Sequence, residues 1–176
     1  AAPAILIGHS LGAAAVLAGA AKVPEAAAVV TIGAPADPAH VVAHFGEARS
    51  EIAARGEAEV RLGGRPFTIK KQFLDDIAAH KMQAAIDGLG KALLVFHAPG
   101  DATVSIDNAA RIYAAARHPK SFVSLDDADH LLSRRADAVY VAEVIAAWAA
   151  RYLGDAEQDE ASAAPGQVRV AETGMG

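Results

Sequence analysis

Short apolar runs alternate with longer helical patterns along most of this chain. Four runs, each of four or five residues, are rich in branched side chains and end near Gly, Pro or polar residues, which predicts buried strands. These runs occupy residues 4–7, 28–32, 92–96 and 121–125. Helical composition or apolar periodicity is found at residues 13–22, 106–117 and 136–153. Strands that alternate with helices predict βαβ units, and therefore an α/β fold with a mostly parallel sheet and flanking helices.

One long segment interrupts this alternation. Residues 37–90 are too many for a simple crossover, and they contain two strand-like stretches around a Gly-Gly pair at 63–64, which predicts a β-hairpin. Helical patterns that include Phe73, Ile77 and Met82 lie beside it. We expect this insertion to form a small cap over the ends of the strands, where it shapes a substrate pocket.

The composition changes after residue 153. Residues 154–167 are rich in acidic and small side chains and contain a Pro-Gly pair, which is typical of a solvated linker. Residues 168–176 alternate apolar and polar positions like the first strand of a further domain. The sequence thus predicts one domain over residues 1–153, a linker, and the start of a downstream domain.

Composition and charge narrow the classes of function. The chain has 176 residues, of which 53% are apolar, enough for one domain of ordinary size with a packed core. Its net charge of -5 gives no electrostatic footprint for nucleic acid or anionic lipid, so we expect neither as a partner. The sequence holds no cysteine, which excludes disulfides, thiolate zinc sites and a Cys nucleophile within these residues. Any nucleophile must therefore be an oxygen or a nitrogen.

The uncharged N-terminal stretch could be interpreted as a membrane span or a signal sequence, because the first charged residue is Lys22. However, no basic segment precedes this stretch, it contains His9 and Ser10, and its glycines favour a strand, a tight turn and a helix. We therefore expect a cytoplasmic protein.

The motif with the most specific chemistry is Gly8-His9-Ser10-Leu11-Gly12, which matches G-x-S-x-G between a predicted strand and a predicted helix. A serine on such a turn projects its Oγ away from the sheet, and the strained backbone needs glycine on both sides because neighbouring chain approaches closely. The N–H groups at the helix start, beginning with that of Leu11, point at the oxyanion that forms when Ser10 attacks a carbonyl carbon. The alternative is a glycine-flanked turn in which Ser10 caps the helix. We interpret His9 as structural.

A serine hydroxyl becomes nucleophilic when a base takes its proton, so this interpretation needs a histidine and an orienting carboxylate. Asp101 follows the third predicted strand and His130 follows the fourth, so both are expected with Ser10 at the carboxyl edge of the sheet. The chain order Ser, Asp, His is the one expected of one particular fold. Two alternatives stay open. Asp101 could be a turn or capping residue, with Asp107 as its competitor, and His130 could be a surface imidazole.

A second group of candidate ligands lies in the insertion. His40 and His44 are four residues apart and Glu47 follows three residues later, so the three side chains could share a helix face and bind a metal. The zinc-protease motif requires Glu directly after the first His, and Val41 stands there instead. We favour a solvated helix face and predict no metal.

These motifs together resemble the α/β-hydrolase family. The resemblance spans roughly residues 4–153 and is carried by Gly8 to Gly12, by Gly100-Asp101 and by Asp129-His130. It implies a serine hydrolase that cleaves small-molecule esters or related acyl bonds, with Ser10 as nucleophile, His130 as base and Asp101 as its orienting acid. Nucleophile, base and oxyanion donors suffice for acyl transfer, so no cofactor is expected.

A narrower resemblance concerns the end of the chain. Residues 62–67, 96–99 and 170–174 resemble bacterial fusions of an α/β-hydrolase with a C-terminal OsmC-like domain. OsmC-like domains handle peroxides with cysteines, so the resemblance implies that such a domain would lie downstream of the hydrolase.

The family also places several strands and the second oxyanion donor before the G-x-S-x-G turn. We therefore expect this chain to be the C-terminal part of an α/β-hydrolase fold, truncated at its N-terminus, with a bare first strand, poor activity on its own and a tendency to associate. The rival hypothesis is a non-catalytic hydrolase-like scaffold that docks or regulates the downstream domain.

Overall fold

The computed structural model describes residues 2–39, 45–62, 65–72, 74–75 and 82–153. Several sequence-based expectations lie outside these residues: the Gly-Gly turn, the helical positions Phe73 and Ile77, the pair His40 and His44, and the predicted linker and downstream domain.

The elements of the chain follow the alternation that the sequence predicts. In chain order they are β1 (Ile5–His9), α1 (Leu11–Gly19), a 3-10 turn (Ala20–Lys22), β2 (Ala28–Ile32), α3 (Glu47–Arg55), β3 (Glu57–Leu62), β4 (Arg65–Lys70), α5 (Met82–Asp87), β5 (Ala92–His97), α6 (Asp107–Ala115), β6 (Lys120–Ser124) and α7 (Arg135–Ala150). The strand predicted at 28–32 has those bounds in the structure, and the other three predicted strands differ by one or two residues at their ends.

A four-stranded parallel sheet forms the centre of the fold, with the order β1-β2-β5-β6. The two inner strands are buried almost throughout, whereas the edge strands β1 and β6 are only half-buried. This agrees with their sequences, because a parallel strand covered on both faces needs a continuous apolar run. The predicted α/β class with a parallel sheet is confirmed.

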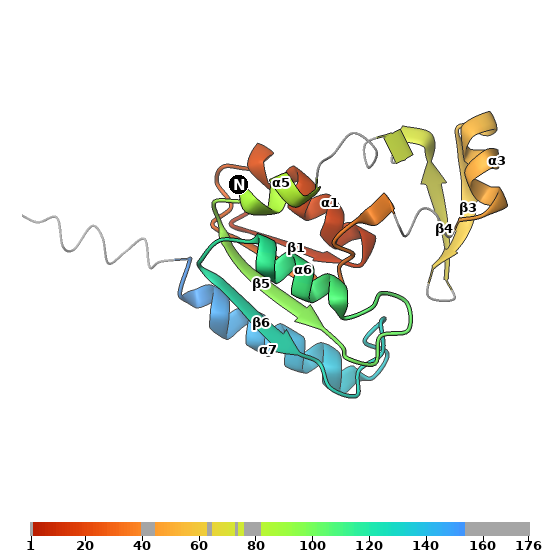
Figure 1. Cartoon of the computed structure of the whole chain (residues 1–176). Coiled ribbons are helices and arrows are strands. Elements are labelled where there is room, and N and C mark those ends of the chain that lie inside the picture. The colour runs from red at the N-terminus through yellow and green to blue at the C-terminus, as the bar shows by residue number, and fades with distance from the viewer. Residues whose placement is uncertain (1, 40–44, 63–64, 73, 76–81, 154–176) are drawn as a thin grey trace, which may run out of the picture.

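Helices cover both faces of the sheet (Figure 1), and the alternation of side chains along the strands decides which helix each residue meets. Val29 and Leu93 point to one face and pack with α1, α5 and α6. The next residues, Val30 and Leu94, point to the other face and pack with α7. The sheet is therefore the middle of three layers, and its strand ends are left open for functional loops.

The insertion contains the predicted hairpin, formed by antiparallel β3 and β4. Figure 1 shows α3 and this hairpin set apart from the four-stranded sheet, on the side to which its arrows point. Ile52 of α3 is fully buried against Ala58 and Val60 of β3. Leu11, the residue after Ser10, belongs to the same apolar cluster, so the insertion packs against the start of α1.

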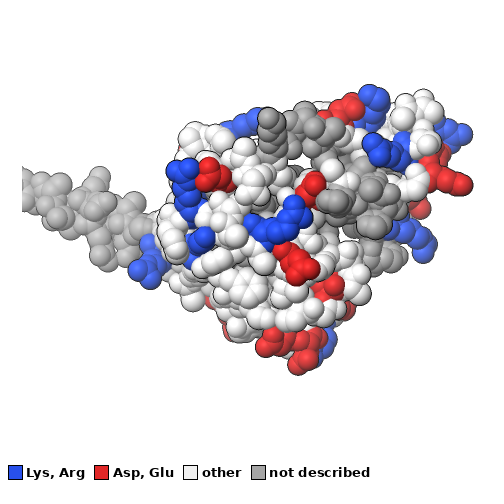
Figure 2. Space-filling model, in the orientation of Figure 1, with Lys and Arg blue, Asp and Glu red and all other residues white. Residues whose placement is uncertain are grey.

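The helices and the charged surface bear on whether the chain could meet a membrane or a polyanion. Within the described residues, no helix combines the length and the apolar character that crossing a bilayer requires. On the face shown in Figure 2, Lys and Arg side chains are interspersed with Asp and Glu and are not gathered into one basic surface.

Candidate active site

Ser10 occupies the sharp turn between a strand and a helix. β1 ends at His9 and α1 begins at Leu11, so Ser10 alone makes the change of direction. Its backbone has φ 53° and ψ -126°, a combination that residues with a side chain rarely adopt and that stores strain. The N–H of Ser10 donates to the carbonyl of Ile32 across 2.8 Å, which ties the turn to the end of β2.

The Ser10 side chain makes no capping hydrogen bond to α1. The capping alternative therefore does not describe this structure, and the hydroxyl is left for another partner. Ala13 and Ala14 donate their N–H groups to the carbonyl of Ser10, so the N–H of Leu11 precedes the first helical hydrogen bonds. This places the predicted oxyanion donor in the first turn of α1, next to Ser10.

The two glycines of the motif have different environments. A Cβ on Gly8 would lie 2.5 Å from Cα of Ala13, so a side chain at this position would collide with backbone. A Cβ on Gly12 would have no atom of the described residues within 4 Å. The expectation of close approach on both sides of Ser10 is therefore wrong for Gly12, because Gly12 faces outward on the first turn of α1.

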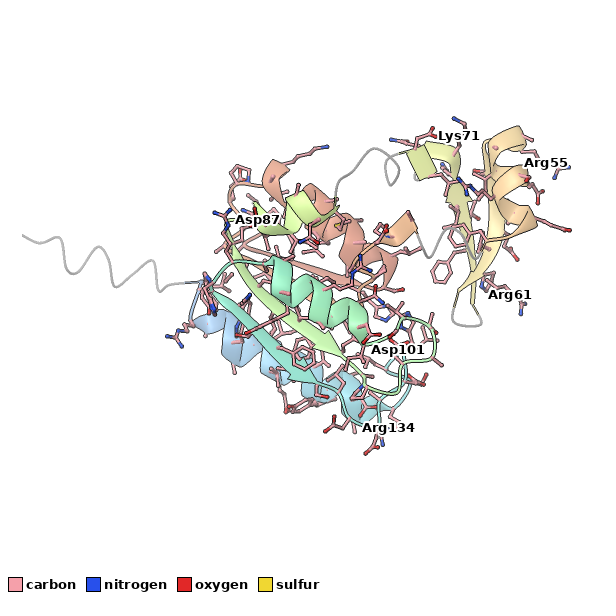
Figure 3. The ribbon with its side chains drawn as sticks, viewed as in Figure 1. Arg55, Arg61, Lys71, Asp87, Asp101 and Arg134 are labelled. Atoms are coloured by element: carbon pink, nitrogen blue, oxygen red, sulfur yellow. The ribbon has the colours of Figure 1, made fainter. Side chains whose placement is uncertain are left out.

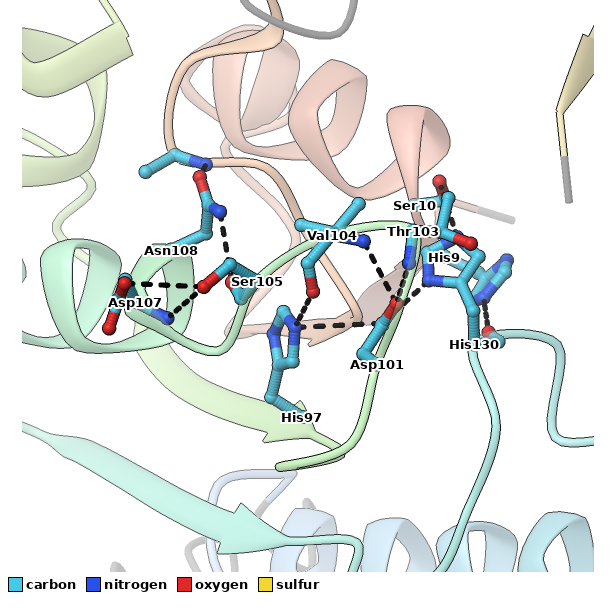
Figure 4. Close-up of polar contacts among 11 residues, drawn as sticks. His9, Ser10, His97, Asp101, Thr103, Val104, Ser105, Asp107, Asn108 and His130 are labelled. Carbon is cyan, nitrogen blue, oxygen red and sulfur yellow. Dashed lines mark hydrogen bonds and ion pairs between the residues drawn. The ribbon is translucent and has the colours of Figure 1, made fainter.

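The fold brings Ser10, His130 and Asp101 together (Figure 4). Nδ1 of His130 lies 2.6 Å from Oδ2 of Asp101, and Nε2 lies 3.0 Å from Oγ of Ser10. A carboxylate only accepts hydrogen bonds, so Nδ1 carries a proton and donates a hydrogen bond to Asp101. Nε2 is then an acceptor, to which the Ser10 hydroxyl donates.

Asp101 is a buried carboxylate, and both of its oxygens accept hydrogen bonds. It follows β5 at the carboxyl edge of the sheet, whereas Asp87 lies at the opposite end of that strand (Figure 3). The Asp101 side chain is only 1% exposed, and its Oδ1 accepts the N–H groups of Thr103 and Val104, each across 2.8 Å. Burial would raise the pKa of Asp101, but hydrogen bonds from His130, Val104 and Thr103 outweigh it and hold the pKa below its usual value. Asp101 therefore faces His130 as an anion.

Asp107, the competing carboxylate of the sequence analysis, lies elsewhere. It begins α6 and accepts a hydrogen bond of 3.2 Å from Oγ of Ser105. It takes no part in the hydrogen bonds of His130.

His130 lies in the loop after β6, with its side chain only 7% exposed. It is thus a largely buried side chain that faces Ser10 and Asp101, which disagrees with the alternative of a surface imidazole. His9 holds the same loop from the other side: its Nε2 donates to the carbonyl of His130 across 2.6 Å, and the two ring centroids are 4.9 Å apart. Burial lowers the pKa of His9, although the hydrogen bond to the His130 carbonyl opposes that shift.

Three residues near this site were not singled out for it from the sequence. Gly33, interpreted as the end of a strand, has φ +56°, and its backbone lies against His130 and Asp101. Asn108 accepts the N–H of Ala36 at Oδ1 across 3.0 Å and so joins the loop after β2 to α6. His97 is fully buried. The signal for His97 was a histidine at the end of an otherwise apolar run, and the signal for Gly33 was a glycine directly after a strand.

The described residues contain no group of three or more side chains that could hold a metal ion. The candidate trio that the sequence analysis set aside cannot be assessed from them, because His40 and His44 are not among these residues; Glu47 begins α3.

No protein-family model and no curated protein matches the sequence. Solved structures do match. The esterase domain of a Rhodothermus marinus protein is 54% identical with a TM-score of 0.77, and the match covers 86% of this chain and 62% of that one. Alpha/beta hydrolase domain-containing protein 10 from mouse is 21% identical with a TM-score of 0.63, covering 86% of this chain and 63% of that one. The chain has the α/β-hydrolase fold.

Other α/β-hydrolase structures agree at the level of the fold. A monoacylglycerol lipase from Paleococcus ferrophilus is 14% identical with a TM-score of 0.64, over 84% of this chain and 68% of that one. The chain spans only 62% of the length of the Rhodothermus esterase domain. Within the α/β-hydrolase chain, Ser10, Asp101 and His130 all follow the carboxyl ends of strands of one parallel sheet.

Proposed function

We propose that the protein is a serine hydrolase that cleaves esters or related acyl bonds of small molecules. The observation that carries this proposal is the pair of hydrogen bonds that joins Ser10 to His130 over 3.0 Å and His130 to Asp101 over 2.6 Å. The 54% identity to a protein described as an esterase domain supports the same class of reaction.

In the first half of the proposed reaction, Oγ of Ser10 attacks the acyl carbon while its proton passes to Nε2 of His130. The anionic Asp101 stabilises the imidazolium that results. The N–H of Leu11 donates to the oxyanion of the tetrahedral intermediate. His130 then gives its proton to the leaving oxygen, the bond to the acyl carbon breaks, and the acyl group stays on Ser10.

In the second half, water takes the place of the leaving alcohol. His130 removes a proton from the water, whose oxygen attacks the acyl carbon, and the bond to Oγ of Ser10 breaks. The proton returns to Ser10, and a carboxylic acid leaves. The sum is one ester and one water converted to one acid and one alcohol, and none of these steps uses a metal or an organic cofactor.

The test is covalent labelling of the whole protein with a fluorophosphonate, followed by a peptide map, because this reagent needs no choice of substrate. We expect the label on Ser10, and we expect its loss in His130→Ala. In parallel, Ser10→Ala is expected to lower kcat for an aryl ester by up to about a millionfold, as in triads whose members act as a unit.

Ser124→Ala is the matched control. The Ser124 hydroxyl donates to the carboxylate of Asp126 at 2.6 Å and not to a histidine, so its removal is expected to leave labelling and hydrolysis unchanged. Absence of label on Ser10, with a known serine hydrolase labelled alongside, would instead favour the non-catalytic scaffold.

A further inference from the structure

A histidine occupies the last position of the most deeply buried strand. Every residue of β5 is buried; the first five are apolar, and the sixth is His97, with no exposed area. Nδ1 of its ring has no hydrogen-bond partner among the described residues. Burial of an unpartnered polar atom lowers the stability of the folded protein. An apolar side chain would therefore be more favourable at this position unless the other ring nitrogen makes a needed interaction.

That other nitrogen holds the loop that carries Asp101. Nε2 of His97 donates to the carbonyl of Val104 across 2.8 Å (Figure 4). The N–H of the same Val104 donates to Oδ1 of Asp101, also across 2.8 Å. His97 therefore holds the carbonyl of Val104, while Asp101 accepts the N–H of the same residue.

The His97 ring also lies directly beside the carboxylate. Its Nε2 is 3.6 Å from Oδ2 of Asp101, the oxygen that accepts the hydrogen bond from His130. At this distance the N–H of His97 contributes a favourable dipole rather than a hydrogen bond. One buried nitrogen thus faces both the loop and the carboxylate that the loop presents.

We infer that His97 is a positioning residue for Asp101, an inference that rests on the proposed function. By tying Val104 to the end of β5, His97 sets the direction in which Oδ2 of Asp101 faces His130. Its ring touches neither Ser10 nor the place of the acyl carbon, so its effect on the reaction passes through Asp101. A displaced carboxylate would leave the protonated base less stabilised in the transition state.

The competing explanation is a core histidine that matters for stability alone. The two explanations differ in kcat, because a core residue changes the fraction of folded protein and leaves the reaction of the folded molecules unchanged. They also differ in pH dependence, because only a residue that acts on Asp101 changes the titration of the catalytic base.

The test compares three substitutions in the whole protein: His97→Gln, His97→Asn and His97→Leu. The Gln amide reaches as far as the imidazole Nε2 and can donate to the Val104 carbonyl, whereas the shorter Asn amide and the Leu side chain cannot. For His97→Leu and His97→Asn we expect kcat to fall roughly 10- to 100-fold with little change in KM, as for small misplacements of catalytic groups. We expect His97→Gln to recover most of this loss. The midpoint of the acid limb of kcat/KM should move to lower pH in His97→Leu.

Thr31→Val is the matched control for burial. Thr31 is also fully buried, and its Oγ1 also lacks a partner among the described residues, but it has no hydrogen bond to the loop that carries Asp101. We expect this substitution to leave kcat and the pH profile unchanged, whatever it does to Tm.

A double-mutant cycle then tests the route of the effect. If His97 acts through Asp101, His97→Leu in an Asp101→Asn background lowers kcat by no more than about twofold beyond Asp101→Asn alone. The inference would be overturned if the kcat losses of His97→Leu and Asp101→Asn multiply in the double variant. It would also be overturned if His97→Asn had the same kcat as His97→Gln.

Labelling of Ser10 separates this inference from the proposed function. If the unsubstituted protein is not labelled by a fluorophosphonate, the proposed function fails and the role of His97 fails with it. If it is labelled and the His97 variants that fold are labelled at the same rate, only the role of His97 is overturned.

Discussion

Gly33 faces the ring of His130 at a distance that leaves little room for a side chain. A Cβ at Gly33 would be 3.3 Å from both Cε1 and Nδ1 of His130, and 3.4 Å from Oδ2 of Asp101. Gly33 thus covers the hydrogen bond between these two residues from one side. Its N–H donates to the carbonyl of Phe96 across 3.0 Å, so the covering backbone is fixed to β5 and does not move freely.

Gly33→Ala is therefore expected to lower kcat for ester hydrolysis by about tenfold or more, because the new methyl group pushes His130 away from Asp101. The backbone adds strain, since an L-residue at φ +56° costs about 1 to 2 kcal/mol. The measurement is kcat together with Tm. Gly46→Ala is the matched control: its φ of +53° carries similar strain, but a Cβ there has no atom within 4 Å among the residues that the structure describes. Equal kcat in the two variants would contradict the prediction.

The two motif glycines predict opposite effects on stability. Gly8→Ala is expected to destabilise the protein by about 3 kcal/mol or more, because the Cβ would meet the backbone of Ala13 at 2.5 Å. Gly12→Ala places a helix-favouring residue in open space on α1 and is expected to raise stability by up to about 1 kcal/mol. Chemical denaturation of both variants measures the free energies of unfolding. A destabilised Gly12→Ala would show that the first turn of α1 needs glycine for another reason.

His9 gives a pH dependence of stability with a defined sign. Its pKa in the folded protein is lowered from 6.5 by burial, so as the pH falls the unfolded chain takes up this proton before the folded one. The stability that neutral His9 contributes is therefore present above pH 6.5 and is lost as the pH falls toward the lowered pKa. His9→Gln keeps a donor for the His130 carbonyl but does not titrate. We expect its Tm to fall less than that of the unsubstituted protein between about pH 7.5 and pH 5.5. Parallel Tm curves would contradict this assignment.

Lys120 provides a prediction for stability alone. Its Nζ donates to the carbonyls of Tyr113 and Ala116 at the end of α6, across 2.7 and 2.8 Å, and lies 4.6 Å from the centre of the Tyr113 ring. Lys120→Met keeps the aliphatic chain and removes these contacts, so we expect a loss of about 1 to 3 kcal/mol in the free energy of unfolding. The exposed Lys22 offers the control, and Lys22→Met is expected to change stability by less than about 0.5 kcal/mol. Because Lys120 begins β6, far along the strand from His130, kcat should be unchanged in both variants.

Much of the fold was accessible from the sequence because local signals and burial agree along it. The inner strand β2 is a continuous apolar run between breakers, and its predicted bounds match those in the structure. Ser10 could be placed on a turn because the G-x-S-x-G motif stands between a strand and a helix. Asp101 and His130 could be placed at one edge because parallel strands bring their carboxyl ends together. These are properties of short segments and of their order along the chain.

The tertiary structure decided the relationships between segments that are distant in the sequence. The choice of Asp101 over Asp107 depends on where the loops after β5 and β6 meet, 29 residues apart in the sequence, and no local pattern contains that information. Gly33 and His97 acquire their importance only when other strands place His130 and Val104 beside them. The sequence thus determined which elements form and which side chains are candidates for the chemistry, because hydrophobic periodicity and turn geometry are local. Which groups touch, and which glycine has no room for a side chain, was decided by packing, because it depends on contacts between segments far apart along the chain.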